Sequence, residues 1–361
     1  MARTTIRTED ITASEVTTAK MATDPTNATN LASGTVPTAR IGAFQTITLD
    51  GTAEGSPAEG DIWYDSGKFY LGTSQTLSNV WSSGGNLATA RRGLAGCGTQ
   101  SAGLCMGGYT GSYSNVTEEY NGSAWSAGGN LATARSYLAG CGTQVAGLCM
   151  GGNVSGSGLN VTEEYDGTSW SSGGNLASAR RSLAGAGTQS AGLCMGGRLV
   201  SDAITNITEE YNGTSWSSGG NLAETNEYLA GAGTQSAGLC MGGYGDPARS
   251  QTQEYNGTSW SAGGDLATGR WALTGAGTQS AALSIGGDIN TANSAVTEEY
   301  DGSAWSSGGD LATARYGLAG AGTQSAGLCM GGYTGSDSNV TEEYVAGPGT
   351  YDLLFNAVGG L

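Results

Sequence analysis

The sequence predicts an all-β protein in which six blades of four strands each close into a β-propeller. Three landmarks predict this fold, because tryptophans recur about every 45 residues, a glycine pair follows each tryptophan, and a tyrosine closes each unit. Between the landmarks, short apolar runs alternate with clusters of Gly, Asn, Asp and Ser, a pattern typical of strands and turns. Four antiparallel strands repeated with this period describe a propeller blade. The tryptophans are Trp81, Trp125, Trp170, Trp216, Trp260 and Trp305.

Composition sets limits on function. The 361 residues include 65 glycines, and 31 acidic against 14 basic residues give a formal net charge of −17. Without a basic stripe to neutralise phosphates, we expect no nucleic-acid binding. We expect neither membrane insertion nor an export signal, since no run approaches about 18 apolar residues and the N-terminus lacks an apolar signal region. The chain has no histidine, which excludes histidine-dependent triads and histidine-containing zinc sites. We therefore expect no metal and no cofactor.

The first complete unit shows how the strands are expected to follow one another. Strands are predicted at 94–99, 103–107, 116–120 and 124–126, because these runs are too short and too rich in glycine for stable helices. The Asn121-Gly122 dipeptide predicts a two-residue hairpin between the third and fourth strands, with positive φ at both central residues. Equivalent dipeptides begin at Asp166, Asn212, Asn256 and Asp301.

Ring closure is predicted from the two ends of the repeat region. Trp81 stands in a fourth strand that no first three strands precede, whereas Tyr344 is followed by Gly347-Pro348-Gly349 instead of a tryptophan. The strand around Trp81 is therefore expected to complete the last blade. Such closure removes free strand edges that would invite aggregation.

The order of landmarks resembles the kelch repeat. The series Tyr120-Asn-Gly-Ser-Ala-Trp125, Leu131, Ala134-Arg135 and Gly151-Gly152 reproduces the order of a kelch unit, and the resemblance covers roughly residues 76 to 345. The interval from tyrosine to tryptophan is shorter than is usual in that family, and alanine stands where proline commonly precedes the arginine. WD-type repeats fit less well, because the chain has no histidine and no Trp-Asp pair. The resemblance implies a six-bladed kelch-like propeller.

Variation among the units is confined to one face. The distance from each tryptophan to the second glycine of the next pair is 27 residues in all six units, whereas that from the glycine pair to the tyrosine ranges from 12 to 14. Only the loop between the second and third strands therefore changes length. In a four-stranded meander this loop opens on the same face as the segment that enters each blade, and that segment changes its side chains.

Aromatic and arginine side chains dominate protein-protein hot spots, and aromatic rings also stack on sugars. The variable face therefore predicts a binding surface, although its loops could also vary because nothing constrains them. The candidate binding residues are Arg92, Tyr109, Tyr113, Tyr137, Arg181, Arg198, Tyr228, Tyr244, Trp271, Tyr316 and Tyr333.

Repeated acidic pairs and cysteines are interpreted as structural. Adjacent strand residues point to opposite sides, so the two acids of Glu118-Glu119 and of its copies cannot act together as catalytic carboxylates. One glutamate of each copy is expected to partner a repeated arginine within its blade, and Asn226 interrupts that arginine series.

The seven cysteines are expected to be buried thiols without disulfides. Asp166-Gly-Thr-Ser-Trp170 is similar to a sialidase aspartate box but lacks its spacing, so no enzyme activity is expected.

The remaining segments are divided as follows: residues 1–45 extended, 46–75 a β-hairpin connector, 76–348 the propeller, and 349–361 an apolar tail. The low-complexity stretches at 11–20 and 30–40, together with Gly60-Asp-Ile-Trp-Tyr-Asp65, resemble segments of tailed-bacteriophage fibre proteins.

That resemblance implies a virion structural protein, assembled in the host cytoplasm and located in the virion. The N-terminal segment would bind other virion proteins as a homo-oligomer, with a trimer favoured, and the propeller would bind a host surface glycan or protein. Two alternatives are a capsid-decorating or other virion protein without a receptor role, and a propeller-fold enzyme that processes glycans.

Overall fold

The computed structural model describes residues 62–65, 68–71 and 79–346. The chain divides into two units, and the propeller forms the second, from Ser78 to Ala346. In the first unit, β1 (Ile62–Asp65) pairs antiparallel with β2 (Lys68–Leu71), which confirms a hairpin in the predicted connector. The expectations for residues 1–45 and 349–361 lie outside the described residues. Within the part of the chain that is described, no helix has the length and apolar character needed to cross a membrane.

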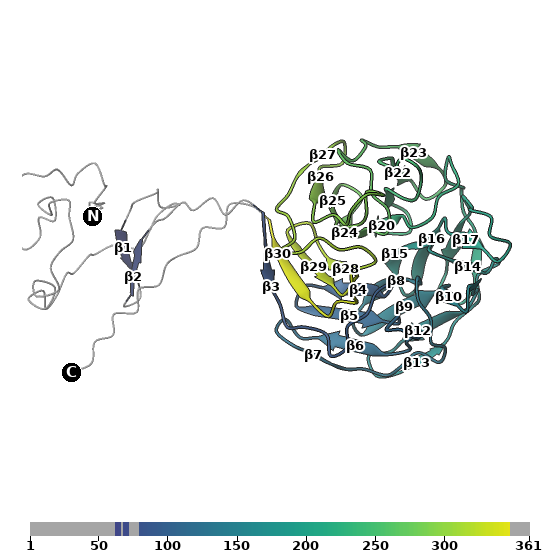
Figure 1. Cartoon of the computed structure of the whole chain (residues 1–361), viewed down its shortest axis with the longest axis horizontal. Coiled ribbons are helices and arrows are strands. Elements are labelled where there is room, and N and C mark those ends of the chain that lie inside the picture. Colours follow the sequence, from purple (N-terminus) through teal and green to yellow (C-terminus); the bar gives the residue numbers. More distant parts are fainter. Residues whose placement is uncertain (1–61, 66–67, 72–78, 347–361) are drawn as a thin grey trace, which may run out of the picture. The chain divides into compact units, whose positions relative to one another are not determined.

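Six four-stranded antiparallel sheets form the predicted ring (Figure 1). Blade 1 comprises β4 (Ala95–Thr99), β5 (Ala102–Met106), β6 (Thr117–Tyr120) and β7 (Trp125–Ala127). Blade 2 comprises β8 (Ala139–Thr143), β9 (Ala146–Met150), β12 (Thr162–Tyr165) and β13 (Trp170–Ser172). Blade 3 comprises β15 (Ala184–Thr188), β16 (Ala191–Met195), β18 (Thr208–Tyr211) and β19 (Trp216–Ser218).

The second half of the ring repeats the same build. Blade 4 comprises β20 (Ala230–Gly233), β21 (Gly238–Met241), β22 (Thr252–Tyr255) and β23 (Trp260–Ala262). Blade 5 comprises β24 (Thr274–Thr278), β25 (Ala281–Ile285), β26 (Thr297–Tyr300) and β27 (Trp305–Ser307). Blade 6 comprises β28 (Ala319–Gly322), β29 (Ala326–Met330), β30 (Thr341–Val345) and β3 (Val80–Ser83). Short ladders add β10 (Asn153–Val154) with β11 (Ser157–Gly158), and β14 (Arg180–Arg181) with β17 (Arg198–Leu199).

The N-terminal strand closes the ring, as the sequence predicts. Strand β3 pairs antiparallel with β30, with Val80 opposite Val345 and Trp81 opposite Tyr344. The two strands lie side by side in Figure 1 although more than 250 residues of chain separate them. Blade 6 is therefore built from both ends of the repeat region.

The turn between third and fourth strands differs from the expected two-residue hairpin. Tyr120 pairs with Trp125, so four residues connect the strands, and Gly122 has positive φ while Asn121 does not. The side-chain oxygen of Asn121 instead accepts hydrogen bonds from the backbone N–H groups of Ser123 (3.0 Å) and Ala124 (2.9 Å). The expectation was wrong because asparagine closes this turn with its side chain, as an Asx turn does.

Glycine pairs end the second strand of each blade because the backbone there cannot carry a side chain. Gly151 and Gly152 have φ values of 62° and 110°, in the region that glycine alone enters readily. A Cβ atom on Gly151 would lie 2.8 Å from the carbonyl oxygen of Arg180, in the segment that enters the next blade. The pair therefore lets consecutive blades approach closely.

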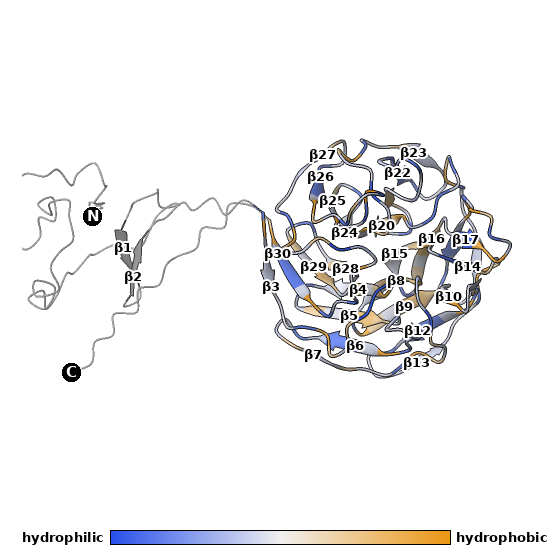
Figure 2. Ribbon diagram, in the orientation of Figure 1, coloured by the Kyte–Doolittle hydropathy of each residue, from blue (hydrophilic) through white to orange (hydrophobic). Residues whose placement is uncertain are grey.

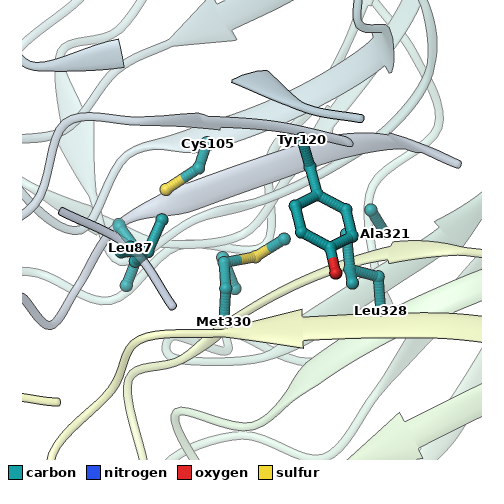
Figure 3. Packing of buried hydrophobic residues seen from close by; sticks show 8 residues of the cluster. Leu87, Cys105, Tyr120, Ala321, Leu328 and Met330 are labelled. Carbon is teal, nitrogen blue, oxygen red and sulfur yellow. The ribbon is translucent and has the colours of Figure 1, made fainter. Parts of the chain in front are cut away.

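The hydrophobic core lies between blades. Where blade 6 meets blade 1, the buried side chains of Cys105 and Tyr120 pack with Leu328 and Met330 from the neighbouring blade (Figure 3). Five similar clusters complete the ring. Second strands such as β5 and β9 are coloured as hydrophobic in Figure 2, whereas β6 and β30 carry the hydrophilic acidic pairs. Each blade therefore buries its apolar strands against its two neighbours.

The same polar contacts join each blade to the preceding one. At the junction of blades 4 and 5, the Tyr300 hydroxyl donates to a carboxylate oxygen of Glu254 (2.6 Å) and Trp305 Nε1 donates to the Thr252 hydroxyl (2.9 Å). The side-chain amide of Gln279 donates to the Tyr255 carbonyl (2.7 Å). Equivalent bonds occur at the other five junctions, which explains why these residue types recur.

A buried ion pair lies inside five of the six blades. In blade 2, Arg135 is fully buried and its guanidinium lies 2.6 Å from the carboxylate of Glu163, which is 2 % exposed. The neighbouring Glu164 faces the other way and accepts the hydroxyl of Tyr211 from blade 3 (2.5 Å). The predicted partnership of glutamate with arginine is confirmed, and the two acids of each pair have separate structural roles. The other four ion pairs are Arg91–Glu118, Arg180–Glu209, Arg270–Glu298 and Arg315–Glu342.

Blade 4 replaces this ion pair by two neutral amides. Asn226 stands in the arginine position, and Gln253 stands in the glutamate position. The Asn226 amide donates to the Gly242 carbonyl (2.7 Å), while the side-chain oxygen of Gln253 accepts the backbone N–H of Ala223 (2.9 Å). Both charges are lost together, so neither partner is left as an isolated buried ion.

All seven cysteines are buried and free, in agreement with the sequence prediction. Burial raises the pKa of the Cys105 and Cys149 thiols to about 11, although a nearby arginine opposes this shift in each case. Since the thiolate is the reactive form, native protein at pH 8 is expected to resist iodoacetamide. Mass spectrometry should show no labelling of the folded protein and seven labelled sites after denaturation. Labelling before unfolding would contradict this expectation.

Candidate recognition surface

Six residues, one from the segment that enters each blade, form a closed ring of backbone hydrogen bonds. Each N–H donates to the carbonyl of the corresponding residue in the preceding blade, over 2.7–2.9 Å. All six residues have positive φ, between 48° and 61°. The ring residues are Gly93, Tyr137, Ser182, Tyr228, Ala272 and Gly317.

Two of the ring residues are bulky where glycine would suffice. Positive φ is uncommon for bulky side chains, and blades 1 and 6 meet the requirement with Gly93 and Gly317. Blades 2 and 4 instead place Tyr137 and Tyr228 there, and their ring centroids lie 5.4 Å apart at an interplanar angle of 90°. Strained backbone of this kind clusters at functional sites. The two tyrosines therefore point to a role beyond holding the fold.

A cavity of about 70 Å³ lies at this ring. Six leucines, one from each blade, and the six ring residues line it. Ser182 is 5 % exposed, and its hydroxyl has no hydrogen-bond partner among the described residues. Burial raises the pKa of Tyr137 to about 12, with a smaller contribution from Tyr228, and the Arg92 guanidinium opposes the shift. The tyrosine stays neutral at physiological pH and can both donate and accept hydrogen bonds.

The tyrosine pair continues into a chain of contacting aromatic rings over blades 4 to 6. Trp271 lies 5.4 Å from Tyr228, 5.6 Å from Tyr244 and 5.5 Å from Tyr316, measured between ring centroids. Tyr244 is 43 % exposed, the most accessible ring of the group. Tyr137, Tyr228, Tyr244, Trp271 and Tyr316 are called the aromatic patch below.

The chain of contacts extends across the junction of blades 6 and 1. Tyr316 contacts Tyr333 at 5.4 Å between centroids, and the Arg92 guanidinium lies 4.7 Å from the Tyr333 ring and 5.0 Å from the Tyr109 ring. Tyr109 in turn meets Tyr113 at 5.6 Å. Nine of the eleven candidate residues thus form one continuous series of side chains.

The two remaining candidates, Arg181 and Arg198, do not join this series through ring contacts. Arg181 forms an ion pair with Asp202 (2.6 Å) and donates to the Gly156 carbonyl of blade 2 (2.5 Å). Arg198 pairs with Glu227 of blade 4, with Nε donating over 2.8 Å. Both arginines therefore contact a neighbouring blade.

Sequence reasoning did not select Ser182, because a serine carries no binding signal by itself. The unusual backbone of the ring positions could not be predicted either, since tyrosine and serine, unlike glycine, do not indicate positive φ in a sequence.

Among the described residues, no three His, Cys, Asp or Glu side chains are grouped so that they could hold a metal ion. No protein-family model matches the chain, and no curated protein matches it.

Proposed function

We propose that the protein is a virion structural protein, such as a tail fibre or similar appendage, whose propeller binds a host surface glycan or protein. The observation that carries the binding role is the aromatic patch, in which Tyr137 and Tyr228 hold positive φ where the other four blades have glycine, serine or alanine. Gly93 and Gly317 form the same backbone ring without a side chain, so the ring itself does not require tyrosine. A selected contact with a ligand accounts for the two tyrosines.

The chemistry of the patch suits a surface ligand. Tyrosine and tryptophan offer a large apolar face together with a polar group and lose little entropy on binding, so they often dominate interfaces. Half-buried rings such as Trp271 are held in place by their neighbours, which reduces the ordering that a ligand must impose. Tyr244, the most exposed ring, would make first contact.

The virion part of the proposal rests on the resemblance of residues 11–20, 30–40 and 60–65 to bacteriophage fibre segments. A trimer formed through this region would present three propellers together. Linked binding sites raise the apparent affinity by about 10²–10⁴ when all can engage at once. Weak contacts at each propeller would then suffice for attachment to a cell.

The test is saturable adsorption of the purified protein to host cells and to isolated envelope glycans. Tyr244→Ala and Trp271→Ala are each expected to weaken binding about tenfold or more, as hot-spot aromatics do. The matched control is Val145→Ala, because Val145 is 65 % exposed and lies in the turn between β8 and β9, away from the variable loops. Binding that survives both aromatic substitutions would refute this choice of surface. Release of sugar from the glycans would favour the enzyme alternative.

A further inference from the structure

Blade 6 differs from the other five blades in how the chain runs. Elsewhere the third strand continues through a four-residue turn into the fourth strand, as from Tyr165 to Trp170, and that strand leads into the next blade. In blade 6 the third strand ends at Val345 and its fourth strand begins at Val80. Four residue pairs of the β3–β30 ladder take the place of the hairpin. Because no turn links β3 to β30, blade 6 is the one blade whose fourth strand can separate from its third strand. In that motion β3 would move with blade 1 and β30 would stay in blade 6.

The contacts shared by all junctions do not compensate for the missing hairpin. Between blades 6 and 1, Trp125 Nε1 donates to the Thr341 hydroxyl (2.9 Å) and the Tyr120 hydroxyl donates to Glu343 (2.5 Å). The Gln100 amide donates to the Tyr344 carbonyl (2.8 Å). These bonds have the same partners and similar lengths as at the other junctions. Any added stability must come from side chains that are particular to this junction.

Arg92 supplies such a contact. Its guanidinium forms an ion pair with Asp337 (2.6 Å), a residue 245 positions away in the sequence and on the far side of the junction. The guanidinium also stacks between Tyr333 of blade 6 and Tyr109 of blade 1. No other arginine among the described residues stacks on an aromatic ring in this way. Both charged side chains are largely covered, with 26 % and 20 % exposure.

We infer that Arg92, Asp337, Tyr109 and Tyr333 form a latch that keeps the propeller ring closed. Arg92 follows β3 in the chain and belongs to the segment that enters blade 1, whereas Asp337 and Tyr333 belong to the loop between β29 and β30. Opening the ring with β3 on the side of blade 1 must separate these groups. The latch therefore opposes the one opening motion that chain continuity does not prevent.

Arg181 provides a matched control, because it occupies the position equivalent to Arg92 in blade 3. It too forms an ion pair of 2.6 Å and reaches the preceding blade through the Gly156 carbonyl. However, the turn between Tyr165 and Trp170 ties the fourth strand of blade 2 to its third strand, so that strand cannot leave with blade 3. Removal of Arg181 should leave ring closure intact.

The test is hydrogen-deuterium exchange of the native full chain, followed in peptides that cover β3 and β30. Arg92→Ala is expected to accelerate exchange in both strands roughly tenfold, as loss of a partly covered ion pair and cation-π contact implies. Asp337→Asn should accelerate it severalfold, and Arg181→Ala less than twofold. Exchange in β12 and β13 should stay unchanged in the Arg92 and Asp337 variants. Equal acceleration in all blades, or no change at β3 and β30 in Arg92→Ala, would overturn the latch.

Discussion

Replacement of Glu163 by glutamine is expected to lower the free energy of unfolding by about 3–5 kcal/mol, the cost of leaving a buried charge without its partner. Arg135 is fully buried, and Glu163 supplies the carboxylate that balances its charge. The remaining partners of Arg135 Nη1 are the carbonyls of Gly151 and Val161, both at 3.0 Å, which carry only partial charges. Urea unfolding of the wild type and of Glu163→Gln at neutral pH measures the difference.

Blade 4 supplies the control, because it carries both substitutions in the same fold. The double variant Arg135→Asn with Glu163→Gln copies the Asn226 and Gln253 arrangement. It is expected to recover roughly 2 kcal/mol relative to Glu163→Gln alone, as a coupling between contacting residues. If the two substitutions changed the free energy of unfolding additively, Arg135 and Glu163 would not be coupled, and the ion pair would not stabilise the blade.

Strong destabilisation is also expected at alkaline pH. The hydroxyls of Tyr165 and Tyr300 are buried at blade junctions and donate to glutamates, and burial followed by these hydrogen bonds raises each pKa to about 12. The ordinary tyrosine pKa is about 10. The folded state therefore holds these protons more tightly than the unfolded state does, so the stabilisation is complete below about pH 10 and is lost as pH rises toward about 12.

The effect is large because it is repeated around the ring. Burial also raises the pKa of the corresponding tyrosine at every other junction, namely Tyr120, Tyr211, Tyr255 and Tyr344. A rise of one in a pKa corresponds to about 1.4 kcal/mol, so the rise from 10 to about 12 at Tyr165 and Tyr300 alone amounts to several kcal/mol. The buried thiols act in the same direction.

Urea unfolding at pH 8, 10 and 11.5 measures this dependence. The free energy of unfolding should change little between the first two values and fall steeply by the third. Tyr165→Phe serves as the control, since it lacks one titrating hydroxyl and should show a shallower fall from a lower starting value. A free energy that stays constant to pH 11.5 would show that the junction hydroxyls do not titrate with folding.

Sequence reasoning predicted the parts of the molecule that depend on local repetition. The closing role of the Trp81 strand followed from counting, because a blade that lacks its fourth strand needs one from elsewhere. The in-blade partner of Arg135 followed from strand alternation, which sends Glu163 and Glu164 to opposite sides. The Asn121 turn was misjudged, because the same dipeptide serves a two-residue turn and a longer turn closed by its side chain.

The sequence by itself determined the number of blades, their strand order and the face on which they differ, since all three follow from the spacing of recurring residues. Only the tertiary structure decided which variable residues meet, because Arg92 and Asp337, or Tyr228 and Trp271, are distant in the chain until the ring closes. It also showed that Arg181 and Arg198 are held in ion pairs and that Tyr244 is the exposed ring of the aromatic patch. The physical reason is that repetition is a local property, whereas contact across blades depends on where the closed ring places each side chain.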